Sequence, residues 1–285
     1  MDPKLIALVT AFCFGLNPVT LKMGFGHGGR PDTAMIVGLA VAVPVYVVLL
    51  PFAGGLQLEL VTPAALVGFI LGGLFGTGIG RRWLYIAIHR IGASPATAIK
   101  NSAPVVSALF AAIVFQEPVT PIRWAAIIAI VVGVGLVTWK PGTPVRSWLD
   151  VGVLAAIGAA LAYGIRPLFL EFGLGAANLP LTAALIGSIA ALTYVLVLGD
   201  RSELRTISRE KAMGYFVFSG VIQAIGFLAL SYGLSDSIVS VVYPVTASAP
   251  LFTLGFTALL LRGQETLGPR TVVGVLAVVA GVIAL

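Results

Sequence analysis

The sequence predicts an all-α, polytopic membrane protein of ten transmembrane helices, arranged as two inverted five-helix repeats. Three observations predict this fold class: an apolar composition, ten apolar runs of helical length, and an internal repeat. Of the 285 residues, 59% are hydrophobic and only 10% are charged, and the mean hydropathy is +1.06. Soluble domains carry about 25% charged residues. Because a soluble fold cannot hide so much apolar surface, the lipid bilayer is the expected partner of this chain.

The charge and the cysteine usage exclude several other classes. A net charge of +6 suggests nucleic acid in a soluble protein. Here the basic residues lie mostly in short loops at the ends of apolar runs, so we expect no nucleic-acid partner. Cys13 is the single cysteine, which excludes a disulfide framework and a Cys-based metal site. We expect no metal and no cofactor, and we expect the first apolar run to be a retained helix.

Ten apolar runs are long enough to cross a bilayer, which needs about 20 residues per helix. Short connectors with Gly, Pro and charged residues separate them, so neighbouring helices are expected to run antiparallel. The runs are 5–24, 33–53, 64–89, 93–116, 121–139, 149–171, 179–199, 212–234, 238–261 and 269–285.

The two halves of the chain repeat each other. A shift of 149 places Leu5, Ala7, Ala11, Gly15, Pro18, Leu21 and Gly24 on Leu154, Ala156, Ala160, Gly164, Pro167, Leu170 and Gly173. A shift of 146 places Ser102-Ala103-Pro104 on Ser248-Ala249-Pro250, and a shift of 148 places Gln116-Glu117 on Gln264-Glu265. An odd number of helices per copy inverts the second copy in the membrane. We therefore predict repeats at 1–142 and 143–285.

Motifs in both halves resemble the EamA-type repeats of the drug/metabolite transporter (DMT) superfamily. In the first half these are the stretch 83–94, Ser102-Ala103-Pro104 and Phe115-Gln116-Glu117-Pro118. In the second half they are Ser231-Tyr232-Gly233, Ser240, Ser248-Ala249-Pro250 and Gln264-Glu265. Gln116 stands where that family often has Gly. The resemblance implies a ten-helix transporter of small molecules and says little about the substrate.

Glycines and prolines mark the helices expected to pack closely or to bend. Gly68, Gly72, Gly76 and Gly80 recur every four residues, which is typical of close helix packing, although a substrate path along this stripe is an alternative. Pro18, Pro104, Pro167 and Pro250 occupy corresponding positions inside the apolar runs of the two halves. Such breaks point to hinges or to a binding site, and the alternative is a static kink.

Four basic residues lie deep in the apolar runs: Arg81, Arg82, Lys100 and Arg166. A fifth, Lys22, is expected to snorkel to the interface. Intramembrane charge is costly and is a functional hypothesis by default. The acids weighed as partners lie at or near run ends, namely Glu59, Glu117, Asp150, Glu171, Asp236 and Glu265. We therefore predict a solvated cavity that favours an anion or the carboxylate of a zwitterion. The alternative is that one or two cations, foremost Arg82 or Lys100, pair with a distant helix-end acid or with carbonyl groups.

Helical spacing extends this cationic set. Arg82, Tyr85 and His89 share one helix face, Tyr163 lies three residues before Arg166, and Asn17 is the repeat counterpart of Arg166. The candidate substrate-binding residues are Asn17, Arg81, Arg82, Tyr85, Lys100, Asn101, Tyr163, Arg166, Tyr243 and Thr246. The alternative for the tyrosines is packing or an interfacial belt. His89 is interpreted as interfacial, with proton coupling as the lesser alternative.

The chain has no phosphate-binding loop of the G-x-x-x-x-G-K-[ST] type and no H-E-x-x-H motif. ATP is therefore not expected to drive it directly, and we do not expect an enzyme. Transport coupled to an exchanged metabolite or to a proton remains open. We expect a multi-pass protein of the cell membrane (plasma or inner), as a monomer or a homodimer.

The orientation in the membrane has two conflicting indicators. The odd-numbered connectors carry ten Lys and Arg residues, and the opposite face carries two, Lys4 and Arg123. The positive-inside rule then places both termini outside. Relatives of the resembling family usually have both termini inside.

The sequence therefore predicts a secondary transporter of a small organic metabolite, anionic or amino-acid-like, that works by alternating access between the two repeats. The alternatives are an exporter of neutral, aromatic or cationic compounds, a flippase for a lipid-linked substrate, and a non-transporting membrane scaffold.

Overall fold

A computed structural model of the chain describes residues 3–53, 55–114, 120–138, 150–199, 210–235, 248–261 and 268–284, and within these ranges it contains helices and no strand. The helices are α1 (Pro3–Gly26), α2 (Pro31–Leu49), α3 (Pro63–Gly73), α4 (Arg81–Ile91), α5 (Ala93–Lys100), α6 (Ala103–Val114), α7 (Pro121–Thr138), α8 (Val151–Ala176), α9 (Pro180–Leu198), α10 (Glu210–Ser235), α12 (Ala249–Leu260) and α13 (Pro269–Ala284). Two short 3₁₀ turns, η1 (Leu50–Ala53) and η2 (Leu58–Leu60), follow α2.

Each of the ten predicted apolar runs contains helix in the part that the structure describes. Five continuous helical stretches are long and apolar enough to cross a membrane: 6–26, 31–52, 63–91, 151–176 and 180–198. Shorter apolar helices cover the described parts of other runs. Residues 139–149 are not described, so the predicted repeat boundary after residue 142 stays a prediction.

Among the described residues, the third and fourth runs depart from a plain α-helix in their interiors. The third run passes from α3 through a π-helical segment, η3 (Leu74–Gly80), directly into α4. A π-helical turn accommodates one inserted residue. The fourth run is broken into α5 and α6 by a turn at Asn101 and Ser102.

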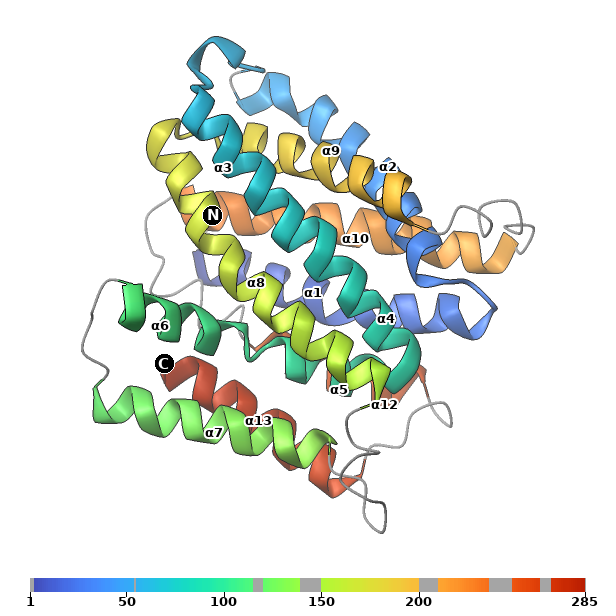
Figure 1. Cartoon of the computed structure of the whole chain (residues 1–285). Coiled ribbons are helices and arrows are strands. Elements are labelled where there is room, and N and C mark those ends of the chain that lie inside the picture. Colours follow the sequence, from blue (N-terminus) through green and yellow to red (C-terminus); the bar gives the residue numbers. More distant parts are fainter. Residues whose placement is uncertain are drawn as a thin grey trace.

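The helices pack as two sets that a two-fold rotation would exchange. Helix α1 packs on α10 and α12, and its counterpart α8 packs on α3 and α6. Helix α2 packs on its own counterpart α9, and α7 packs on its own counterpart α13. Figure 1 shows the α2/α9 pair at one edge of the bundle and the α7/α13 pair at the opposite edge. This exchange of partners is the arrangement predicted for inverted repeats.

Individual glycine contacts repeat in the same way. A Cβ on Gly220 would lie 3.1 Å from Gly38 Cα, and a Cβ on Gly73 would collide with Gly187 Cα. Residues 38 and 187 differ by the same 149 positions as the first helices, and 73 and 220 differ by 147. The two crossings, α2 on α10 and α9 on α3, are therefore copies of one contact.

The π-helical segment explains why the repeat offset changes along the chain. Before the π-helical segment, Phe69 contacts Gly173, and Phe216 makes the equivalent contact with Gly24. The two phenylalanines are therefore counterparts, and they are 147 positions apart. After this segment, the serine-alanine-proline motifs are offset by 146. The first half thus has one residue more than the second across this segment, as a π-helical insertion requires. The insertion places Arg81 of the first half opposite Phe227 of the second in the repeat alignment.

Replacement of Gly73 by Ala is expected to destabilise the protein by about 1–3 kcal/mol, because the added methyl group overpacks the crossing with Gly187. The measurement is thermal unfolding of the purified protein in detergent. Gly214→Ala is the matched control, since it lies in helix α10 with no atom within 4 Å of the added Cβ. Equal melting temperatures for the two variants would contradict the close crossing.

Candidate functional site

The glycine stripe of the third run, Gly68, Gly72, Gly76 and Gly80, packs against one face of α8. This contact confirms the packing interpretation. All four glycines contact this helix, through Gly68 with Gly173, Gly72 with Leu170, Gly76 with Arg166, and Gly80 with Tyr163. A Cβ on Gly80 would lie 3.2 Å from the Tyr163 ring, and a Cβ on Gly76 would lie 2.8 Å from Arg166 Nε. Absence of side chains on the stripe therefore makes the room that Tyr163 and Arg166 occupy.

Two of the predicted arginines, one from each repeat, meet at one aromatic ring. The guanidinium carbon of Arg81 lies 5.9 Å from the ring centre of Phe227, and that of Arg166 lies 5.1 Å from it. Arg81 is only 5% exposed. The Tyr46 side chain, which is also buried, interacts electrostatically with both arginines. Helices α2, α4, α8 and α10 thus converge on this point.

Lys100 lies beside these two arginines, and Arg81, Lys100 and Arg166 are called the cationic cluster below. The Nζ atom of Lys100 lies 4.9 Å from the ring centre of Tyr163, and its charge interacts with that of Arg166. It is the last residue of α5, where the negative end of the helix dipole favours a cation. Asn101 follows it as the C-cap of α5, where its backbone N–H donates to the Thr97 carbonyl. Both residues thus lie at the break in the fourth run.

A polar network lies beside the cluster. The Asn17 side-chain amide donates to the Ser219 carbonyl and to Ser219 Oγ, both at 2.9 Å. The Tyr85 side chain also bonds with Ser219 and interacts electrostatically with Arg81 and Tyr163. Asn17 and Tyr85 are buried. The structure therefore brings together Asn17, Arg81, Tyr85, Lys100, Tyr163 and Arg166 from the predicted set.

Arg82 has a carboxylate partner, which corrects the expectation that all four deep cations lack one. Its Nε lies 2.7 Å from Asp32 Oδ1 and its Nη2 lies 2.9 Å from Asp32 Oδ2. Tyr194 of α9 also hydrogen-bonds to Arg82. Asp32, in the first turn of α2, is not one of the six acids named above as possible partners. For Arg82 the alternative of a helix-end acid is therefore confirmed, and substrate binding by Arg82 stays a prediction.

Within the described residues neither Arg81 nor Lys100 forms an ion pair with a carboxylate. Glu117, Asp236 and Glu265 lie outside these residues, so the lack of a carboxylate partner for Arg81 and Lys100 stays a prediction. Tyr243 and Thr246 lie in 236–247, outside the described residues, and stay predictions. The described residues also contain no group of three or more His, Cys, Asp or Glu that could hold a metal ion.

The four prolines fall into two classes rather than one. Pro18 and Pro167 lie inside α1 and α8, as predicted. Pro104 and Pro250 are instead the second residues of α6 and α12, which corrects their placement inside continuous helices. Proline suits a first helical turn because no intrahelical acceptor is available there for an N–H group.

Matched hydroxyl groups hold the turns before the two interior prolines. Ser107 Oγ donates to the Gly164 carbonyl at 2.7 Å, and Thr253 Oγ1 donates to the Gly15 carbonyl at 3.1 Å. Each acceptor lies three residues before a proline, in the turn that the proline disturbs. Both bonds link one repeat to the other. The hinge role of the four prolines stays a prediction.

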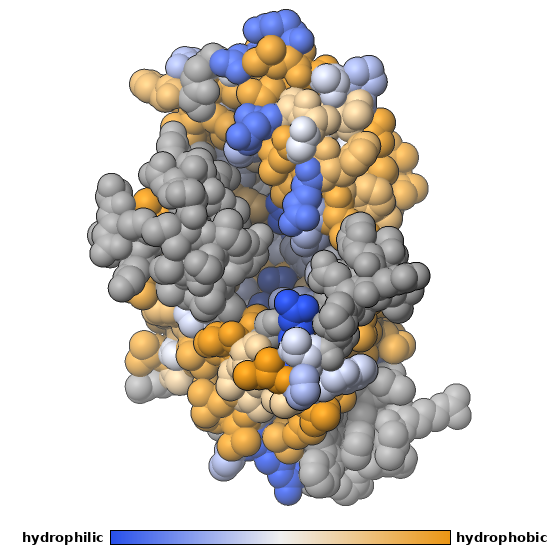
Figure 2. Space-filling view, turned by 90° about the vertical axis from the view of Figure 1, so that its left-hand side faces the viewer, coloured by the Kyte–Doolittle hydropathy of each residue, from blue (hydrophilic) through white to orange (hydrophobic). Residues whose placement is uncertain are grey.

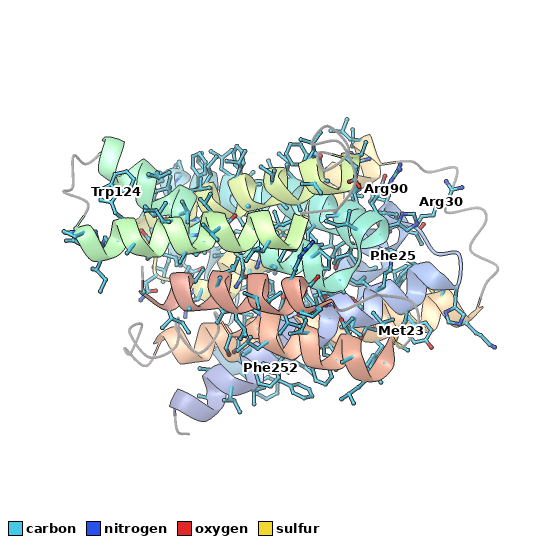
Figure 3. The ribbon with its side chains drawn as sticks, turned by 90° about the horizontal axis from the view of Figure 1, so that it is seen from below. Met23, Phe25, Arg30, Arg90, Trp124 and Phe252 are labelled. Atoms are coloured by element: carbon cyan, nitrogen blue, oxygen red, sulfur yellow. The ribbon has the colours of Figure 1, made fainter. Side chains whose placement is uncertain are left out.

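The surface is hollowed on the face that holds both termini. Figure 2 views this face and shows hydrophilic residues within a hollow near its middle, between apolar regions. The opposite end of the bundle carries Arg30 and Arg90, whereas Trp124 lies at the end shared with the termini (Figure 3). At the Arg30 end, Phe25 packs on both His89 and Phe216, and Lys22 donates to the His89 carbonyl. His89 is exposed, which agrees with the interfacial interpretation.

Sequence reasoning missed Tyr46, Ser219, Phe227 and Asp32. Phe227 had a usable signal, since it is the repeat counterpart of Arg81 once the π-helical insertion is counted. Asp32 had another, because an acid in the first turn of a helix at the start of an apolar run is close to the membrane. Tyr46 and Ser219 carry no pattern that separates them from packing residues.

Neutralising either partner of the Arg82–Asp32 pair, by Arg82→Gln or Asp32→Asn, is expected to destabilise the protein by about 1–3 kcal/mol, because it leaves the other charge without its partner. The measurement is a double-mutant cycle of thermal unfolding in detergent. The double variant is expected to lose less than the sum of the two single losses. Strict additivity would contradict the pairing.

The chain is similar to a known protein family, to one curated relative and to a solved structure. The model of the EamA-like transporter family matches residues 4–139 and again residues 150–285. An uncharacterized protein of Methanocaldococcus jannaschii is 25% identical over 137 residues, which are 48% of this chain and 97% of the relative. That relative therefore has about the length of one repeat. A solved structure described only as "Crystal structure of protein" covers 100% of this chain and 97% of its own, with a TM-score of 0.57 and 17% identity. The last match shows the fold alone.

Proposed function

The chain belongs to the EamA-like transporter family, and on that premise we propose that it is a secondary transporter of a small organic metabolite that is anionic or amino-acid-like. It is a multi-pass membrane protein, and the family match makes it a membrane transporter of small molecules. The proposal adds the substrate class, alternating access between the two repeats, and the cell membrane as its location.

The meeting of Arg81 and Arg166 at the ring of Phe227 carries the proposal. The two arginines come from different repeats, so a ligand that binds both bridges the halves. Arg81 is buried, and no carboxylate among the described residues forms an ion pair with it. A buried cation without a counter-ion is costly in a membrane, and a bound anion relieves that cost. Transporter sites of this kind lie at the interface of inverted repeats.

The packing at the two ends of the bundle supports alternating access. One end is hollowed (Figure 2). Toward the other end, Phe25 packs on Phe216 and the Arg82–Asp32 pair joins α4 to α2. Because the repeats are inverted copies, exchanging their conformations would close the hollowed end and open the other. Exchange of metabolites or proton coupling would each fit this cycle.

A second candidate is export of aromatic or cationic compounds, which the rings of Tyr46, Tyr85, Tyr163 and Phe227 favour. In that function the basic residues would be structural. The flippase and scaffold alternatives gain no particular support from the described residues.

The test is a thermal-shift series on the purified protein in detergent with acetate, inorganic phosphate, glutamate and choline. A ligand that binds only the folded state stabilises it by about 2.7 kcal/mol at a hundredfold excess over its Kd. We expect stabilisation by at least one of the anionic compounds and loss of that effect in Arg81→Gln. Arg90→Gln is the matched control, because it removes one exposed positive charge at the end of the bundle (Figure 3). Stabilisation by choline alone, unchanged in Arg81→Gln, would favour the second candidate instead.

A further inference from the structure

The cationic residues of the site are not matched by the other repeat. The two-fold exchange pairs Arg81 with Phe227, Lys100 with Thr246, and Arg166 with Asn17. It also pairs Tyr163 with Phe14. Each basic side chain thus has a neutral residue as its counterpart in the sequence. The two sides of the site, called walls below, therefore differ in charge.

The residues of the cationic cluster, Arg81, Lys100 and Arg166, form one side of the site and are called the cationic wall. They lie on α4, α5 and α8. These three helices pack against one another. Lys100 interacts electrostatically with Arg166, and Tyr46 interacts with both Arg166 and Arg81, so the three charges belong to one cluster. Aromatic rings at 4.9–5.9 Å face all three side chains.

The neutral wall consists of the counterparts on α1 and α10, which also pack against each other. Phe14 and Phe227 meet edge to face with ring centres 5.5 Å apart. The amide nitrogen of Asn17 is already bonded to Ser219, which leaves the amide oxygen and the two rings as the chemistry of this wall. Thr246 lies outside the described residues and contributes only its identity to the comparison.

Charge balance decides between classes of anion. Arg81 and Lys100 form no ion pair with a carboxylate of the described residues. Their positive charges repel each other in a medium of low dielectric, and the repulsion falls with each negative charge that a ligand brings. A monocarboxylate brings one. An amino acid also brings an ammonium group, which would enter the cationic cluster, where no carboxylate of the described residues forms an ion pair with Arg81 or Lys100. A dianion brings two negative charges and no positive one.

From this unequal charge we infer that the transporter selects a dianionic metabolite, a dicarboxylate or a phosphate monoester, over monocarboxylates and amino acids. The inference rests on the proposed function and narrows its substrate class. The charged groups of the ligand bind the cationic wall of Arg81, Lys100 and Arg166. The uncharged part of the ligand lies against the neutral wall of Phe14, Asn17 and Phe227.

The test compares probes that differ by one group, with Kd taken from thermal shifts of the full-length protein in detergent. Succinate, aspartate and butyrate share a four-carbon chain and differ in charge, and glycerol 3-phosphate is compared with glycerol. We expect succinate or glycerol 3-phosphate to bind at least about tenfold more tightly than aspartate and butyrate. Whichever of the two binds more tightly identifies the dianion as a dicarboxylate or a phosphate monoester.

Replacing residues of the cationic wall by their counterparts in the other repeat tests whether this wall selects dianions. Lys100→Thr and Arg166→Asn install the residues that the other repeat has at the counterpart positions in the sequence, so each removes one charge. Each is expected to weaken dianion binding by about 10- to 100-fold and butyrate binding less. Lys100→Arg retains the charge and is expected to retain the preference. Arg90→Gln, away from the cluster, is expected to change neither.

The outcomes separate this inference from the proposed function. Aspartate or butyrate binding as tightly as succinate, with loss of binding in Arg81→Gln, overturns the dianion inference and leaves an anion transporter. An unchanged dianion preference in both Lys100→Thr and Arg166→Asn also overturns it. Binding of none of these anions, together with stabilisation by choline or by nothing, overturns both.

Discussion

The arrangement of this protein depends on how closely its helices approach one another at glycines. Lipid offers no hydrophobic force that drives helix onto helix, so association depends on close packing, for which small residues are needed. The α9 crossing on α3 at Gly187 and Gly73, and its copy of α2 on α10, bring backbone against backbone. Gly76 and Gly80, further along the same helical run, make room for Arg166 and Tyr163 of α8. The position of the charged site is thus a consequence of the packing that builds the bundle.

Buried charge is the second constraint, and the chain meets it in two ways. Arg82 is neutralised by Asp32, with both carboxylate oxygens engaged. Arg81, Lys100 and Arg166 face the rings of Phe227 and Tyr163. An aromatic face attracts a cation but carries no net charge, so in the proposed function a bound anion supplies the opposite charge for Arg81 and Lys100. Helix α4 therefore carries two adjacent arginines with different surroundings, Arg81 in the cationic cluster and Arg82 in the ion pair with Asp32.

The duplicated backbone and the unequal side chains have separate consequences. Contacts such as Ser107 with Gly164 and Thr253 with Gly15 hold the two halves together at equivalent points. Equivalent contacts of this kind are what the proposed alternating access needs, because that proposal requires two related conformations of similar energy in one fold. The residues that differ between the halves, Arg166 and Asn17 among them, would give the proposed ligand a defined orientation. The π-helical segment η3 supports this difference, because it sets which residue of the first half opposes Phe227.

The sequence by itself determined the ten runs, the repeat and the packing role of the glycine stripe, because hydropathy, offset and helical spacing are properties of the chain read along its length. It also identified Arg81, Lys100 and Arg166, since a charge inside an apolar run is visible without a fold. Only the tertiary structure decided their partners. Asp32 and Arg82 are separated by 50 positions, and Phe227 approaches Arg81 from the other repeat. Such pairings depend on the rotation and the crossing angle of each helix. One π-helical insertion shifts the pairings by a residue. The spacing of apolar residues along the chain records neither the helix orientations nor the insertion.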